Sequence, residues 1–292
     1  GKTSNNTAKE TMKKQLTLAA LRSLLFTAIL LLIAHSSNLV AQTKRPMELE
    51  DMFRVRRVSD PQLSPDGKWV AFVIAEVDKA NNKTNSDIWL IPSAGGEMRK
   101  LTNSPKQDRH PRWSPDGQSI AFESNRGGSY QIYLQSVAGG EAKQLTSIST
   151  EANQAVWSRD GKNIAFVSGV FPEFSDKPFA ESDALNKKRQ DDRDNSKVTG
   201  RVFDKLLYRH WDSPVDDKRQ HIFVVPADGQ TGPRDVTPGE NDAVPTSSTF
   251  SAGDDFDFSP DGTELAFTTP PVPIREQAWR TDHNISTVNL RT

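Results

Sequence analysis

The side chains most able to carry acid–base or metal chemistry are sparse in this chain. Its 292 residues include no cysteine and five histidines, which are His35, His110, His210, His221 and His283. No two of them have the H-x-x-x-H or H-E-x-x-H spacing of a zinc site, and the lack of cysteine excludes disulfides and thiolate ligands. The chain has no G-x-S-x-G nucleophile elbow and no phosphate-binding glycine loop. We therefore predict no catalytic residue, no metal and no cofactor in this chain.

One stretch of aromatic and charged residues is the candidate for ligand contact. In the functional interpretation, Arg209, His210 and Asp212 lie at the mouth of the fold and contact a substrate. In the alternative, Tyr208 and Trp211 anchor the stretch to the fold, while Arg209 and Asp212 pair locally. Both interpretations need a scaffold that places the stretch, and the rest of the sequence describes one.

The evidence for that scaffold is a repeated sequence motif, the turn phrase apolar-Ser-Pro-Asp-Gly, which is followed two residues later by an aliphatic-Ala-Phe triplet. The third copy of the turn phrase has Arg in place of Pro. Pro and Asp suit the centre of a type I turn and Gly the left-handed residue after it, so each copy predicts a β-hairpin. The alanine points to the opposite face from its neighbours, and its small size lets the next sheet lie close. The copies begin at Leu63, Trp113, Trp157 and Phe258, and the triplets begin at Val70, Ile120, Ile164 and Leu265.

A repeat of about 40–50 residues made of strands and turns is typical of propeller blades. The sequence therefore predicts an all-β fold, an incomplete β-propeller of four-stranded antiparallel blades with Trp89, Trp113 and Trp157 in the core. Third strands rich in β-branched and aromatic residues begin at Asp87, Gln131 and His221. Short outer strands begin at Leu101, Leu145 and Val236. We place the blades at about 58–102, 108–146, 153–237 and 250–292, within a domain of 47–292.

The third and fourth copies of the phrase lie about one blade further apart than expected, which predicts an insertion at 169–220. Its charged part, residues 186–197, has the composition of a solvated or mobile loop. We therefore expect trypsin to cut first within Lys177–Lys197.

Residues 1–41 read as an upstream extension followed by a helical signal peptide. Basic residues, among them Arg22, precede an apolar run at Ser23–Ala34, and Leu39–Ala41 offers a small residue at a cleavage position. The alternative is an uncleaved anchor. Both predict export, and the cleaved form would have no stable membrane association.

The charge balance argues against a nucleic-acid partner. Lys plus Arg total 37 and Asp plus Glu total 38, so the chain lacks the excess of positive charge that binds phosphate backbones.

The blade phrase with its Ala-Phe triplet and Leu-Thr ending resembles the propeller repeats of the prolyl oligopeptidase family of serine peptidases, and it is also similar to TolB-type periplasmic propellers. Residues 55–67, and 208–212 followed by 218–224, resemble the bacterial dipeptidyl-peptidase and acylaminoacyl-peptidase branch. The resemblance runs from about residue 47 to the end. It implies a periplasmic or secreted bacterial protein whose propeller caps an active site and screens peptides by size.

The chain departs from that family in one respect. Family members follow a propeller of seven or eight blades with an α/β-hydrolase domain that carries the catalytic Ser, Asp and His, and this chain shows neither. We expect an N-terminal fragment that is inactive alone and that would meet a peptide substrate through the hydrolase domain. The alternative is a non-catalytic, TolB-like propeller that binds a protein or peptide partner.

An incomplete propeller leaves sheet faces without neighbours. We expect the faces of Val70–Phe72, Phe256–Phe258 and Leu265–Phe267 to be partly exposed, in an open arc prone to self-association. A closed four-bladed ring, with a strand near Phe53–Val58 completing the fourth blade, is the alternative.

Overall fold

The structure is a computed structural model, and it divides the chain into two units, Gly1–Leu49 and Glu50–Thr292. Residues 22–25 are helical and exposed; the rest of the expected signal peptide lies outside the described residues. Within the described part of the chain, no helix is long and apolar enough to cross a membrane. The described residues are 22–25, 45–198, 200, 202–203, 208–210, 213–245, 255–273, 276–277, 279–280 and 282–291.

Most of the regular elements are strands. Besides the helical residues 22–25, the helices of the described part are α2 (Leu49–Arg54), the 3-10 helix η1 (Pro172–Phe174) and α3 (Phe179–Asp194). The strands are β1 (Arg57–Leu63), β2 (Trp69–Asp78), β3 (Lys83–Pro92), β4 (Arg99–Lys100), β5 (Asp108–Trp113), β6 (Ser119–Ser124), β7 (Gln131–Ser136), β8 (Lys143–Gln144), β9 (Asn153–Trp157), β10 (Asn163–Val170), β11 (Arg209–His210), β12 (Ser213–Pro214), β13 (Arg219–Pro226), β14 (Arg234–Asp235), β15 (Phe256–Phe258), β16 (Glu264–Thr269) and β17 (Asn284–Asn289).

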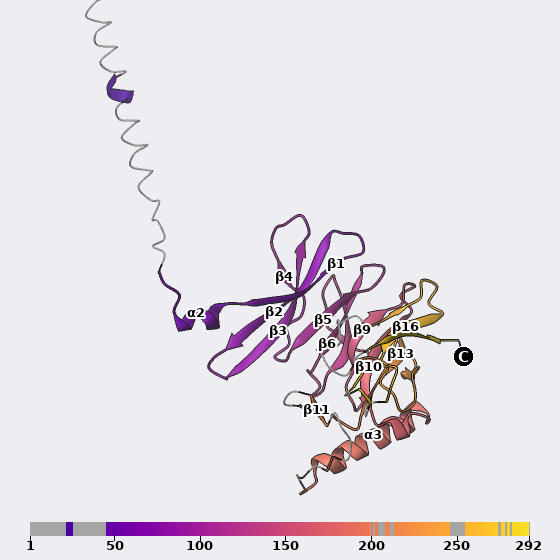
Figure 1. The fold of residues 1–292 in the computed structure, drawn as a ribbon. Coiled ribbons are helices and arrows are strands. Elements are labelled where there is room, and N and C mark those ends of the chain that lie inside the picture. Colours follow the sequence, from indigo (N-terminus) through magenta and orange to yellow (C-terminus); the bar gives the residue numbers. More distant parts are fainter. Residues whose placement is uncertain are drawn as a thin grey trace, which may run out of the picture. The chain divides into compact units, whose positions relative to one another are not determined.

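These strands form four antiparallel sheets that follow one another along the chain (Figure 1). Sheet 1 is β1-β2-β3-β4, sheet 2 is β5-β6-β7-β8, sheet 3 is β9-β10-β13-β14 and sheet 4 is β15-β16-β17. A separate two-stranded ribbon, β11-β12, lies in the segment between β10 and β13. The predicted all-β, propeller-type fold of antiparallel blades is confirmed.

Each repeated phrase forms the expected turn between the first two strands of its sheet. In sheet 1, Gly67 has φ of 72° and its N–H donates to Ser64 O over 2.9 Å. The hydroxyl of Ser64 donates to Asp66 Oδ1 over 2.7 Å and accepts from the N–H of Trp69 over 2.9 Å. The same contacts recur in the other three sheets, so the Ser and Asp close each turn with side-chain hydrogen bonds.

The outer strands were predicted to begin at Leu101, Leu145 and Val236. In the structure each outer strand ends at the residue directly before that position, and a threonine follows it. The reason is that the threonine side chain replaces a backbone partner: Ile88 N donates to Thr102 Oγ1 over 3.0 Å instead of to a carbonyl. Leu101 N and Thr102 N both donate to Ile88 O, which closes the end of the ladder. The equivalent hydroxyls of Thr146 and Thr237 accept from Ile132 N and Ile222 N.

Three apolar clusters hold consecutive sheets together, and the small alanine of each of the first three triplets faces the next sheet as predicted. Ala71 packs with Ile120 and Phe122 of sheet 2, and Ala121 packs with Ile164 of sheet 3. Ala165 continues the pattern in the cluster that joins sheets 3 and 4. Among the described residues, no cluster joins sheet 1 to sheet 4.

Two of the three tryptophans expected in the core contact it. Trp113 and Trp157 pack against core clusters, and their Nε1–H groups donate to backbone carbonyls of the preceding sheet, Gln62 O and Arg112 O. Trp89 instead lies half-buried on the face of sheet 1 that points away from sheet 2. Its predicted core position is wrong, because no described sheet covers that face.

On sheet 4, the partial exposure that was predicted is seen at Phe267, which is half-buried, but not at the other three large apolar positions. Phe256, Phe258 and Leu265 are buried, because they pack against sheet 3. On sheet 1, Phe72 is also largely buried, whereas Val70 is half-buried. The alternative of a closing strand near Phe53–Val58 is not seen, since Phe53 lies in α2 and sheet 4 contains β15, β16 and β17.

The charged run at residues 186–197 was predicted to be a loop, and this is wrong: most of it belongs to α3. The helix is tied to the sheets by Asn186, which is buried and accepts a hydrogen bond from Phe171 N over 2.7 Å. At its other end, Arg193 pairs with Asp216, and the Arg189 guanidinium lies 4.3 Å from the Phe171 ring centroid. The partners in these contacts, Phe171 and Asp216, lie outside the run, so the composition of the run does not reveal them.

Candidate functional site

The first strands of sheets 1, 2 and 3 each contain one residue in a strained backbone conformation. Asp60, His110 and Gln154 have φ of 49°, 56° and 58°, a left-handed region that is costly for residues other than glycine. Each stands three residues before the apolar residue that opens the turn phrase. The strand register shifts there, as in a β-bulge. Strain of this kind, about 1–3 kcal/mol per residue, persists where the surroundings enforce it and is concentrated at functional sites.

A chain of hydrogen bonds joins the first two of these bulges. Arg112 Nη1 donates to both carboxylate oxygens of Asp60 over 3.0 Å, and Arg112 Nη2 lies 2.7 Å from His110 Nε2. A guanidinium only donates, so His110 Nε2 accepts and the ring proton of neutral His110 is on Nδ1. That nitrogen lies 3.5 Å from Glu123 Oε1. Strands β1, β5 and β6 are thereby linked through alternating acidic and basic groups.

Glu123 carries the chain on to the third bulge. Its buried carboxylate accepts from Arg109 Nε over 2.8 Å through Oε2 and from the backbone N–H of Gln154 over 2.7 Å through Oε1. The Arg109 guanidinium stacks 3.9 Å from the ring centroid of Tyr130, where burial raises the pKa of the phenol. We call Asp60, Arg109, His110, Arg112, Glu123 and Gln154 the inner-strand cluster.

The chemistry open to the inner-strand cluster is binding by hydrogen bonds. Both ring nitrogens of His110 face charged partners, Arg112 and Glu123, which does not leave the imidazole available as a general base. The side-chain oxygen of Gln154 is buried without a hydrogen-bond partner and can accept from an N–H of a ligand. The described residues contain no group of acidic and histidine side chains suited to a metal ion.

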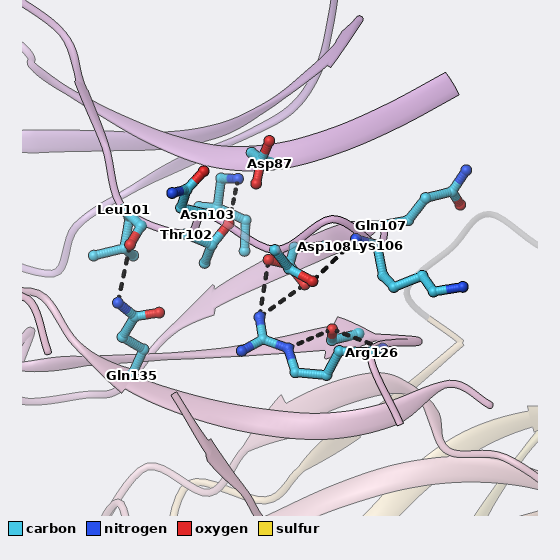
Figure 2. A network of polar contacts seen from close by, with 12 residues as sticks. Asp87, Leu101, Thr102, Asn103, Lys106, Gln107, Asp108, Arg126 and Gln135 are labelled. Carbon is cyan, nitrogen blue, oxygen red and sulfur yellow. Dashed lines mark hydrogen bonds and ion pairs between the residues drawn. The ribbon is translucent and has the colours of Figure 1, made fainter. Parts of the chain in front are cut away.

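A second polar network is structural, and Figure 2 shows it between sheets 1 and 2. Asp108, at the start of β5, accepts two hydrogen bonds of 2.9 Å from Arg126 Nη2. Asp87 on β3 pairs with Lys100 over 2.8 Å, and burial raises the pKa of Asp87 even though Lys100 opposes the shift. Gln135 Nε2 on β7 donates to Leu101 O over 2.9 Å. The network fixes the connection from β4 to β5, and therefore the entry to the bulge at His110.

His221 is likewise committed to the fold. It is fully buried on β13, with Nδ1 2.7 Å from Asp235 Oδ2 and Nε2 3.0 Å from Gly239 O. Since the carbonyl can only accept, Nε2 carries a proton, and the ring ties β13 to the segment that follows β14.

The predicted substrate-contact residues lie in the segment between β10 and β13. Arg209 and His210 form β11, and the exposed Arg209 lies 6.0 Å from the Tyr208 ring centroid. The His210 side chain and the whole of Asp212 lie outside the described residues. Whether the three lie together is therefore outside what the structure describes, and their role stays a prediction.

Sequence reasoning missed the inner-strand cluster. The spacing of His110 to the other histidines indicates no site, and no sequence motif includes Gln154. The signal available was positional: a polar residue stands three places before the turn phrase in each of the first three blades.

The chain is similar in sequence to a known domain family and to known proteins. Residues 48–181 match the TolB beta propeller domain family. Dipeptidyl-peptidase 5 of Porphyromonas gingivalis is 33% identical over 238 residues, which is 80% of this chain and 32% of that protein. This chain is a homologue of dipeptidyl-peptidase 5 with a TolB-type propeller. The enzyme of the same name from Porphyromonas endodontalis is 26% identical over 84% of this chain and 34% of its own length.

Solved structures agree on the fold. The acylaminoacyl peptidase of Pyrococcus horikoshii superposes with a TM-score of 0.55 at 15% identity, over 82% of this chain and 32% of that one. The chain thus spans about a third of the length of the relatives that it matches.

Proposed function

We propose that this chain is the propeller segment of an exported serine exopeptidase of the prolyl oligopeptidase family, where it screens peptides before they reach a hydrolase domain. The observation that carries the proposal is the 33% identity to a dipeptidyl-peptidase 5 across four-fifths of the chain. In the proposed layout, residues 1–41 are a leader and 47–292 belong to the propeller.

The inner-strand cluster supports a screening role. β1, β5 and β9 are each the edge strand at which their own sheet begins. The sheets of a propeller surround a central channel. Hydrogen-bonding groups on such strands suit the N–H and C=O groups of an extended peptide. Arg209, His210 and Asp212 are proposed as further contacts to the peptide.

A chimera tests the screening role. Residues 47–292 replace the homologous segment of the Porphyromonas gingivalis enzyme, and hydrolysis of short chromogenic peptides is compared with that of long peptides carrying the same N-terminal residues. We expect cleavage of the short substrates and exclusion of the long ones. Gln154→Ala should raise KM with little change in kcat, whereas Lys162→Ala, an exposed turn substitution, should change neither. Equal cleavage of short and long peptides by a folded chimera contradicts screening.

Export is tested separately. Residues 12–46 are fused to an alkaline phosphatase reporter that is active only outside the cytoplasm. Active reporter in a Gram-negative host supports export, and inactive reporter removes that part of the proposal.

A binding module without catalysis is the second candidate, because a Tol-Pal system protein TolB of Bordetella pertussis is 46% identical over 48 residues, 16% of this chain. A binding module predicts that the chimera is folded but inactive. It also predicts that the chain retains a protein partner from a periplasmic extract.

A further inference from the structure

Five Asp-Gly pairs occur in the chain. At such a pair an aspartate side chain can react with its own backbone, because glycine has no side chain to shield the amide nitrogen that follows the aspartate. The fifth pair, Asp228-Gly229, lies in the turn between β13 and β14, and the turn phrases are matched references for it. The aspartates of the turn phrases are Asp66, Asp116, Asp160 and Asp261.

The main chain of the β13–β14 turn follows the same path as that of the turn phrases. Gly229 has φ of 69°, and its N–H donates to Pro226 O over 3.0 Å. Gln230 N donates to Asp228 Oδ1, also over 3.0 Å. All four turn phrases have a glycine with φ of 68–72° and the same two bonds, over 2.9 Å and 3.0–3.1 Å. A difference in reactivity between these turns therefore comes from their side chains and their exposure.

The β13–β14 turn lacks one side chain, the serine two positions before the aspartate. In every turn phrase that serine hydroxyl donates to the aspartate Oδ1, over 2.5–2.7 Å. This bond is the largest cause of the lowered pKa of all four aspartates, so it favours their ionised form. Pro226 stands at the same position of the β13–β14 turn and has no hydroxyl. Within the described residues, Asp228 accepts only the bond from Gln230 N.

The reaction open to an Asp-Gly pair is closure of a cyclic imide. The glycine nitrogen attacks Cγ of the protonated aspartate, a C–N bond forms, and the carboxyl hydroxyl leaves as water with the amide proton. Water then opens the imide. Opening at the side-chain carbonyl restores aspartate, whereas opening at the main-chain carbonyl gives isoaspartate, whose main chain runs through Cβ and Cγ and whose α-carboxylate is free. An ionised carboxylate is a poor electrophile, so the serine bond opposes the first step.

The β13–β14 turn is also more open to water than the turn phrases. Asp228, Gly229 and Gln230 are exposed, whereas the glycine of each turn phrase is half-buried. The serine is buried in the first three phrases and half-buried in the fourth. Exposed segments move more freely, so the nitrogen of Gly229 can reach the carboxyl more often, and water is at hand to open the imide.

We propose that Asp228-Gly229 is a site of spontaneous isoaspartate formation in the folded protein, and that the turn serines protect the other four pairs. The product lengthens the main chain by one methylene between β13 and β14. These two strands also carry the bond between His221 Nδ1 and Asp235 Oδ2, which are 2.7 Å apart, so the change falls within sheet 3. The inference concerns the chain itself and is independent of the proposed peptidase role.

The test is to hold the folded chain in a mildly acidic buffer made with water enriched in heavy oxygen. Each imide that opens takes up one heavy oxygen atom, so peptide mapping by mass spectrometry counts the events at every pair. Backbone fragmentation distinguishes isoaspartate from aspartate. We expect isoaspartate at Asp228 to accumulate several-fold faster than at any turn phrase. A rate at Asp228 that does not exceed the other four overturns the proposal.

Two substitutions move the serine between turns. Pro226→Ser places a hydroxyl two positions before Asp228 and should slow isomerisation there several-fold, to the level of the turn phrases. Ser64→Ala removes the hydroxyl beside Asp66 and should speed isomerisation at Asp66, with Asp116 of the same chain as the unchanged control. An unaltered rate in either variant overturns the protective role of the serine. Thermal melting establishes that both variants are folded.

The unfolded chain separates the effect of the turn from that of the neighbouring sequence. In concentrated urea the serine bonds are lost, so the rates at the five pairs should converge. If Asp228-Gly229 keeps its lead there, the residues next to it in sequence set its rate instead of the missing bond, and the proposal fails.

Discussion

The turn serines set the acidity of the carboxylates two positions after them. Ser259 Oγ donates to Asp261 Oδ1 over 2.7 Å, and this bond is the largest cause of the lowering of the Asp261 pKa from 3.8 to about 2. The folded pKa is below the unfolded one, so the stabilisation is present above about pH 3.8 and is lost as the pH falls through about 2. We expect Ser259→Ala to raise the pKa of Asp261 toward 3.8.

NMR titration of the carboxylates checks this expectation. In the same variant Asp66 should keep its lowered pKa, because its own partner Ser64 is unchanged. An Asp261 pKa that stays near 2 would show that the N–H and hydroxyl of Thr263 hold the carboxylate without the serine.

The threonines that end the outer strands should be costly to replace. Thr102 is 2% exposed, and its hydroxyl is the acceptor for the backbone N–H of Ile88. Thr102→Val keeps the shape but leaves a buried donor without a partner, so we expect a loss of about 1–3 kcal/mol in the free energy of unfolding. Urea unfolding measures it. Thr102→Ser, which keeps the hydroxyl, should lose clearly less, and equal losses in the two variants would point to packing instead.

At the scale of elements, α3 changes the expected pattern of proteolysis. Asn186 donates to Ser182 O over 2.9 Å and accepts from Phe171 N, so the middle of the helix is fixed to the end of β10. We now expect trypsin to spare Lys187 and Lys188 in the wild type, and Asn186→Ala to speed cleavage after them, as identified by mass spectrometry. Lys68, on the turn of sheet 1, is the internal control and should be cut equally in both. Rapid cleavage of the wild type at Lys187 would contradict a stable helix and support the loop that the composition of the segment indicates.

The elements differ in how far the sequence reveals them. The hairpins were predictable because Ser, Asp and Gly close each turn within five residues of one another, and the alanine faces followed from strand alternation. α3 was not predictable from composition, because its partners, Phe171 and Asp216, lie outside the charged run. The inner-strand cluster was missed for a related reason. Its defining feature is a backbone conformation, and the three residues that adopt it have different side chains.

At the scale of the whole molecule, the chain should not hydrolyse peptides by itself. It has no nucleophile elbow, and in the described residues the inner-strand histidine faces Arg112 and Glu123 rather than a serine. We expect no turnover of dipeptidyl or acylaminoacyl chromogenic substrates, with the Porphyromonas gingivalis enzyme as the positive control. Turnover that a serine-directed fluorophosphonate titrates in proportion to the chain would contradict this.

The order of pairing in sheet 3 has a consequence for how the protein folds. In sheets 1, 2 and 4 every strand pairs with its neighbour in sequence, whereas β10 must find β13 across residues 171–218. The free-energy cost of closing a loop rises slowly with its length, by about 0.6 kcal/mol per doubling. This cost comes before the eight-residue pairing of β10 with β13 can stabilise the sheet. Sheets 1 and 2 can therefore form while sheet 3 is still open. We therefore expect the closing of β10 on β13 to be the slow step of folding, and a chain whose insertion is shortened outside η1 and α3 should fold faster.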